Sequence, residues 1–231
     1  MSEPATPISE HGLKGETTTL EPDRQERLLA RRSAESRATV PAADLHTVLD
    51  AGALLARERE LGCGVTAAVI AAAARALRIV PRLNGSYRDG RYELYGRVNV
   101  SVTAIHGDLH ATPTILDADQ KPASEIAGEL ADLYAQARAG ELSPAQTAGS
   151  TFTVLDSSAY PLLALTPVIM PPHAGALGFG PLRETPVVRG GEVVAGHTMQ
   201  LSLAVDHRIA HGHHAAAFLE EVRAFLEEAR I

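Results

Sequence analysis

Residues 198–212 read TMQLSLAVDHRIAHG, a strand-like pattern that ends among histidines. Polar residues alternate with an apolar set formed by Met199, Leu201, Leu203 and Val205. A period of two is typical of a strand with one face on a core. Gly212 allows a sharp turn before a following helix. The pattern therefore predicts that His207 is displayed at the edge of a rigid scaffold, where a general base is most useful.

The rest of the chain predicts helices interleaved with strands. Helices are expected from Asp23 to Pro41, from Asp50 to Gly62, over 66–80, from Pro122 to Gly140 and after Gly212. Strands are expected over 44–49, 83–88, 92–95, 98–102, 151–155, 173–179, 187–194 and 198–205. A hairpin turn at Asp89-Gly90 breaks a strict β-α-β rhythm. We therefore expect an α/β (α+β) fold, a mixed β-sheet with helices packed on it.

Composition bounds the class of protein. The 231 residues are 45% hydrophobic and 21% charged, with a formal net charge of -7, so nucleic acid and membranes are not expected partners. The single cysteine, Cys63, fits a cytoplasmic protein without disulfides. The apolar run 67–74 is too short for a bilayer, and no secretory signal is present. Residues 1–23 are polar and aperiodic, which predicts a flexible N-terminal arm before a domain over 24–231.

The histidines after the last strand raise the question of a metal. His211, His213 and His214 follow His207 closely in the sequence. Their spacing crosses a strand-to-helix turn instead of following one helical face, and no Cys or Glu with ligand spacing lies nearby. We therefore expect no metal, with His213 and His214 on the helix surface or at a subunit contact.

Several motifs occur along the chain in a fixed order. They are LARR at 29–32 with SR at 36–37, VPRLN at 80–84, RVNV at 97–100, ARAG at 137–140, GSTFT at 149–153, TPVI at 166–169 with PP at 171–172, GFG at 178–180 and DHRIAHG at 206–212. The chain thereby resembles the catalytic domain of the dihydrolipoyl acyltransferase component of 2-oxoacid dehydrogenase complexes. The resemblance implies a chloramphenicol acetyltransferase-like fold and a homotrimer or a higher-order assembly, with active sites between subunits.

The resemblance also assigns a role to His207. In that family the matching histidine removes a proton from the acceptor, which then attacks an acyl thioester. Neutral imidazole suits this task because it accepts a proton near pH 7. The neighbouring Asp206 is expected to orient Arg208 or to pair with Arg32.

The chain departs from the family pattern in three places. His211 replaces an acid that resembles the partner of the arginine matching Arg32, so Arg32 is expected to pair with Glu35 or Asp206 instead, or else to lie in a changed pocket. Leu155 stands at the position of a serine that stabilises the oxyanion, a loss that typically costs about 3 to 4 kcal/mol. Ser157, Ser158 or backbone amides are the candidate replacements. Neither a lipoyl domain nor a subunit-binding domain precedes residue 24, so a lipoyl arm on the same chain is not expected.

These observations favour a lipoyl-independent acetyltransferase. Acetyl-CoA would be the donor substrate, no cofactor would be bound covalently, and the acceptor would be a small-molecule hydroxyl. This function resembles that of the family branch that acetylates tetronate polyketide intermediates in antibiotic biosynthesis. Two alternatives stay open. One is a core acyltransferase that serves a lipoyl domain on a separate chain, and the other is an inactive trimeric scaffold.

Overall fold

The computed structural model describes residues 14–15, 17–104 and 112–230. Most of the predicted N-terminal arm lies outside the described residues, and residues 17–22 form neither helix nor strand. The helices are α2 (Arg24–Thr39), α3 (Gly52–Leu61), α4 (Gly64–Ile79), α5 (Ala123–Ala139) and α6 (Gly212–Glu227), with short 3-10 turns η1 (Pro81–Leu83), η2 (Ala118–Gln120) and η3 (Pro144–Thr147).

A mixed sheet of seven strands forms the centre of the molecule. Its strands are β1 (Ala42–Asp50), β4 (Val100–Ala104), β5 (Thr114–Ile115), β6 (Phe152–Asp156), β7 (Gly175–Phe179), β8 (Arg183–Arg189) and β9 (Glu192–Asp206). They are ordered β1-β9-β7-β6-β4-β5, and β8 pairs with β9. Strands β4, β6 and β7 run parallel, whereas β9 is antiparallel to β1, β7 and β8. The predicted fold class, a mixed sheet with helices packed on it, is confirmed.

The long strand β9 corrects one prediction. Residues 187–194 were expected to form a single strand, but they contain the turn between β8 and β9. Gly190 and Gly191 both have positive φ, at 61° and 87°, which suits a tight two-residue hairpin. The two valine-rich halves therefore belong to antiparallel partners, and β9 continues without a break to Asp206.

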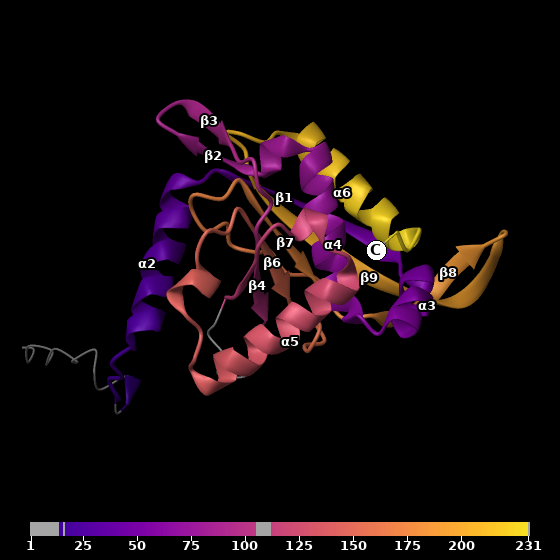
Figure 1. The fold of residues 1–231 in the computed structure, drawn as a ribbon, viewed down its shortest axis with the longest axis horizontal. Coiled ribbons are helices and arrows are strands. Elements are labelled where there is room, and N and C mark those ends of the chain that lie inside the picture. Colours follow the sequence, from indigo (N-terminus) through magenta and orange to yellow (C-terminus); the bar gives the residue numbers. More distant parts are fainter. Residues whose placement is uncertain (1–13, 16, 105–111, 231) are drawn as a thin grey trace, which may run out of the picture.

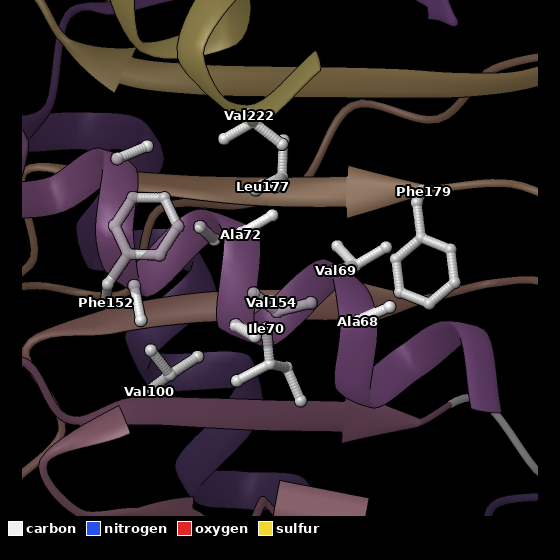
Figure 2. Packing of buried hydrophobic residues seen from close by; sticks show 14 of the residues in the cluster. Ala68, Val69, Ile70, Ala72, Val100, Phe152, Val154, Leu177, Phe179 and Val222 are labelled. Carbon is white, nitrogen blue, oxygen red and sulfur yellow. The ribbon is translucent and has the colours of Figure 1, made fainter. Parts of the chain in front are cut away.

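Helix α4 packs on one face of the sheet and is flanked by α5 and α6 (Figure 1). Its alanines are buried because small side chains let the helix approach the strands closely. Figure 2 shows Ala68, Val69, Ile70 and Ala72 of this helix among the side chains of the strands. The alanine-rich segment is thus a core helix, as its composition predicts.

Helix α3 begins at Gly52, close to the start that was expected at Asp50. Ala51 occupies the cap position, but Asp50 Oδ1 still accepts the backbone N–H of Gly52 at 2.9 Å. Within the described residues no single helix is long and apolar enough to span a membrane. Helices α3 and α4 reach that length and composition only as a pair joined by a 110° bend.

Candidate active site

His207 is exposed at the end of β9, where two backbone hydrogen bonds hold the chain. Asp206 N donates to Ala174 O at 2.8 Å, and His207 N donates to Pro41 O at 3.0 Å. The backbone is therefore tied to segments on both sides of β9, while the imidazole remains open to solvent. This arrangement confirms the prediction that a strand end displays His207.

The turn after His207 is formed by different residues from those expected. Residues 207–209 make it, with Ile209 N donating to Asp206 O at 3.1 Å. Gly212 is instead the first residue of α6, and it does not have a positive φ. A loop closed by backbone hydrogen bonds thus replaces the glycine turn.

Asp206 and Arg208 form an ion pair on either side of His207. The Asp206 carboxylate is only 2% exposed and accepts from Arg208 Nε at 2.9 Å and Nη2 at 2.7 Å. Hydrogen bonding to this carboxylate raises the pKa of the Arg208 guanidinium. Two donors that match two oxygens restrict both side chains. Of the two roles considered for Asp206, the structure therefore shows the orientation of Arg208.

Arg32 lies exposed on α2 and makes no ion pair within the described part of the chain. Among the described residues, the expected ion pair of Arg32 with Glu35 or Asp206 is absent. The Asp206 carboxylate binds Arg208 instead. The pKa of His173 is lowered, first by burial of its ring and further by the positive charge of the Arg32 guanidinium.

His211 is the N-cap of α6. The backbone N–H of His214 donates to His211 O at 2.9 Å, and His214 Nδ1 accepts the backbone N–H of His211 at 3.2 Å. The second bond requires His214 Nδ1 to be unprotonated. Burial lowers the pKa of His214, and the charges of His213, Arg82 and His211 add to this effect. In place of the family acid, His211 therefore caps a helix, with its ring centroid 5.2 Å from that of His207.

The histidines of this region pack ring against ring. His213 and His214 have centroids 3.8 Å apart, and His211 lies 5.9 Å from His214. Among the described residues, no group of three or more His, Cys, Asp or Glu side chains is arranged to hold a metal ion. The geometry of the cluster is that of helix capping and surface stacking.

The candidate oxyanion donors lie at the opposite end of the sheet from His207. Ser157 follows Asp156, the last residue of β6. Asp156 pairs with Phe179 on β7, and Phe179 pairs with Leu201 on β9. His207 comes six residues after Leu201, so at 3.3 Å per residue the two positions are roughly 20 Å apart along the sheet. Within one chain, His207 and these serines cannot contact the same carbonyl group.

Ser157 and Ser158 also differ in availability. Ser157 is fully buried and its hydroxyl donates to Phe179 O at 2.7 Å. Ser158 is exposed, with its hydroxyl donating to Asp156 Oδ1 at 2.6 Å. Leu155, at the family serine position, is half-buried and has no polar group. Ser158 and nearby backbone amides are therefore better placed than Ser157 to reach a ligand.

His173 is a buried polar residue that the sequence did not single out. Its Nδ1 lies 3.0 Å from Thr153 Oγ1, and its Nε2 lies 3.1 Å from Ser150 Oγ and 3.0 Å from Ser150 O. Thr153 Oγ1 in turn lies 3.0 Å from Ser101 Oγ. In the alternating pattern of β6, the Thr153 side chain lies on the face away from the main hydrophobic core. Nothing in the local sequence pattern indicates its hydrogen-bond partner, which lies 20 residues later in the chain. This network ties β6 to the segment before β7.

We expect the free energy of unfolding to decrease as the pH falls below about 6.5, partly because of His173. Burial lowers the pKa of folded His173 below its ordinary 6.5, so the unfolded chain binds the proton more readily. The stabilisation is complete above that value and is lost on acidification. Urea unfolding between about pH 5 and pH 7.5 measures it. His173→Gln, which keeps an amide donor and acceptor, should show a flatter profile, and an unchanged profile would contradict the assignment.

Comparison with known proteins bears directly on this geometry. The family model "2-oxoacid dehydrogenases acyltransferase (catalytic domain)" matches residues 14–230. The chain belongs to this family. By family it is therefore an acyltransferase catalytic domain, as its motifs predict.

Two curated relatives of this acyltransferase domain are larger proteins. It is 33% identical over 164 residues to the dihydrolipoyllysine-residue acetyltransferase of the acetoin cleaving system of Bacillus subtilis, which covers 71% of the chain and 41% of the relative. It is 28% identical over 211 residues to the corresponding component of the pyruvate dehydrogenase complex of Rickettsia bellii, covering 87% and 50%. The chain thus spans about half the length of these relatives. Neither supports the tetronate branch.

Solved structures confirm the fold of the acyltransferase domain. The "probable dihydrolipoamide acetyltransferase" of Listeria monocytogenes superposes with a TM-score of 0.86 at 27% identity, covering 92% of this chain and 95% of that one. Chloramphenicol acetyltransferase superposes with a TM-score of 0.56 at 15% identity, covering 84% and 92%, which is a likeness of fold alone. The predicted chloramphenicol acetyltransferase-like architecture is confirmed.

Proposed function

We propose that this domain transfers an acyl group between coenzyme A and a dihydrolipoyl group presented by a lipoyl domain. The observation that carries the proposal is His207, exposed on a loop that backbone hydrogen bonds hold rigidly, in a chain of this family. The names of the two curated relatives describe transfer to a dihydrolipoyllysine residue. We therefore propose a thiol as the acceptor instead of the hydroxyl of a tetronate, because neither relative supports the tetronate branch.

The proposed chemistry needs one base and one site for developing negative charge. His207 takes the proton from the acceptor thiol, and the resulting thiolate attacks the thioester carbonyl. The tetrahedral oxyanion collapses, the carbon–sulfur bond to the donor breaks, and the departing thiolate receives the proton back from His207. The reaction exchanges one thioester for another, so the energy of the bond is conserved. General base catalysis of this kind contributes about 10²- to 10⁴-fold.

We further propose that each active site lies between two protomers of a homotrimer. The support is the separation of roughly 20 Å along the sheet between His207 and the end of β6, which one chain cannot bridge. A neighbouring protomer can bring its own β6 end to His207. Ser158, which is exposed, or a backbone amide beside it then stabilises the oxyanion, since Ser157 is fully buried.

An acceptor comparison tests the proposed function. With acetyl-CoA as the donor, we expect acetyl transfer to dihydrolipoamide to exceed transfer to small alcohols by at least about tenfold in kcat/KM, since a thiol ionises more readily than an alcohol. The acetyl thioester formed on dihydrolipoamide is measured directly, in assays with the purified protein. Faster acetylation of a hydroxyl acceptor would favour the lipoyl-independent alternative. Absence of transfer to either acceptor, in a folded trimer, would favour the inactive scaffold.

A further inference from the structure

A two-stranded hairpin lies beside the loop that carries His207. It consists of β2 (Gly85–Arg88) and β3 (Arg91–Leu94) and is separate from the seven-stranded sheet (Figure 1). Asp89 and Gly90 form its turn with φ of 50° and 76°, as the sequence predicts. Packing of the main hydrophobic core does not explain why this hairpin is present.

The base of this hairpin is held firmly. The side-chain amide of Asn84, which is buried, donates to Tyr95 O at 3.0 Å and to Arg97 O at 2.9 Å. The strands also approach closely at Gly85, where an added Cβ would lie 2.5 Å from Glu93 O. The hairpin can therefore hold its side chains in defined positions.

Two tyrosines face each other across the hairpin. Tyr87 and Tyr92 are register partners, so their side chains project from the same face, and their ring centroids are 6.1 Å apart. Each ring packs against an arginine. The Arg208 guanidinium carbon lies 4.8 Å from the centroid of Tyr87, and that of Arg82 lies 4.3 Å from the centroid of Tyr92.

Both arginines contact the loop of His207. Arg208 belongs to it and lies between the Asp206 carboxylate and the Tyr87 ring. Arg82 Nη1 donates to Ile209 O at 3.4 Å, a long hydrogen bond to the other side of the same loop. The hairpin thus contacts two residues of this loop, Arg208 directly and Ile209 through Arg82, with one aromatic–cation pair for each.

We propose that Tyr87 and Tyr92 are positioning residues that hold the 206–209 loop, and with it the imidazole of His207, through Arg208 and Arg82. This inference rests on the proposed role of His207 in acyl transfer. His207 lies directly between Asp206 and Arg208, so motion of the Arg208 side chain is transmitted to its backbone. Displacing a reacting group by about 1 Å can lower a rate substantially, which makes a fixed loop valuable.

The test compares two substitutions of Tyr87. Tyr87→Leu removes the aromatic face, and we expect kcat to fall about tenfold while KM for acetyl-CoA changes less than about twofold. Tyr87→Phe keeps the ring and should restore kcat to near the wild-type value. Tyr95→Leu is the matched control, because Tyr95 follows the same hairpin and, among the described residues, no guanidinium packs on its ring.

Hydrogen exchange supplies a readout independent of activity. The backbone amides of residues 207–210 should exchange faster in Tyr87→Leu than in the wild type, Tyr87→Phe or Tyr95→Leu, with exchange in α4 unchanged. A wild-type kcat and unchanged exchange in Tyr87→Leu would overturn the proposal. Equal losses in Tyr87→Phe and Tyr87→Leu would overturn it too, since the hydroxyl would then matter instead of the ring. If the wild-type protein transfers no acyl group, the proposed function fails, while the exchange comparison still decides whether the hairpin holds the loop.

Discussion

Replacing His207 with alanine is expected to lower kcat for acyl transfer by about 10²- to 10⁴-fold, the usual contribution of a general base. The imidazole is exposed and its backbone amide is bonded to Pro41 O, so the substitution removes the base without disturbing the core. The free energy of unfolding should change by less than about 0.5 kcal/mol, as is usual for surface positions. Steady-state kinetics with acetyl-CoA and dihydrolipoamide, together with urea unfolding, measure both quantities.

Two further variants sharpen this comparison. His207→Gln keeps hydrogen-bonding groups but is not basic, so it should be as slow as His207→Ala. His213→Ala removes a neighbouring histidine that does not form part of the proposed base and should keep near wild-type kcat. Turnover above about a tenth of the wild-type rate in both His207 variants, well beyond what loss of a general base allows, would contradict the assignment.

Mixed oligomers made from two inactive variants are expected to recover about a quarter of the wild-type activity if each site joins two protomers of a symmetric ring. The first variant is His207→Ala. The second is Ser158→Trp, which places a bulky ring at the exposed end of β6. In an equal random mixture, half of the protomers supply His207 and half of their neighbours supply an open β6 end. The product of these fractions gives the expected recovery.

The experiment requires co-assembly from unfolded or co-expressed chains, with acetyl transfer as the readout. Variants that are assembled separately and then combined provide the control and should stay inactive. An inactive co-assembled mixture would show that His207 and the β6 end act within one chain, contrary to the roughly 20 Å separation along the sheet. Full activity of Ser158→Trp alone would show that the β6 end does not form part of the site.

Much of the fold could be predicted because its elements have clear local periods. The alternation of residues 199–205, the alanine-rich helix and the Asp89-Gly90 hairpin all appear where they were expected. The strand prediction at 187–194 was wrong because an apolar run does not show where two glycines reverse the chain. The prediction of a sharp turn at Gly212 was wrong for a similar reason, since a glycine at the start of a helix can be the first residue of that helix.

The candidate site was predictable only in part. His207 follows directly from the strand that displays it, and Ser158 follows from its distance to the GSTFT motif. The pairing of Asp206 with Arg208, the stacking of Arg208 on Tyr87 and the capping by His211 depend on side-chain geometry that residue spacing does not determine. The buried contact between His173 and Thr153 likewise joins segments with no shared local pattern.

By itself, the sequence determined most of the helices and strands and which histidine stands at a strand end, because local periodicity reflects which side chains can be buried together. The tertiary structure alone decided that β6 and β7 run parallel beside an antiparallel β9. That order places Ser158 and His207 at opposite ends of one sheet. Strand order depends on contacts between residues far apart in the chain, whose energies no short stretch of sequence contains.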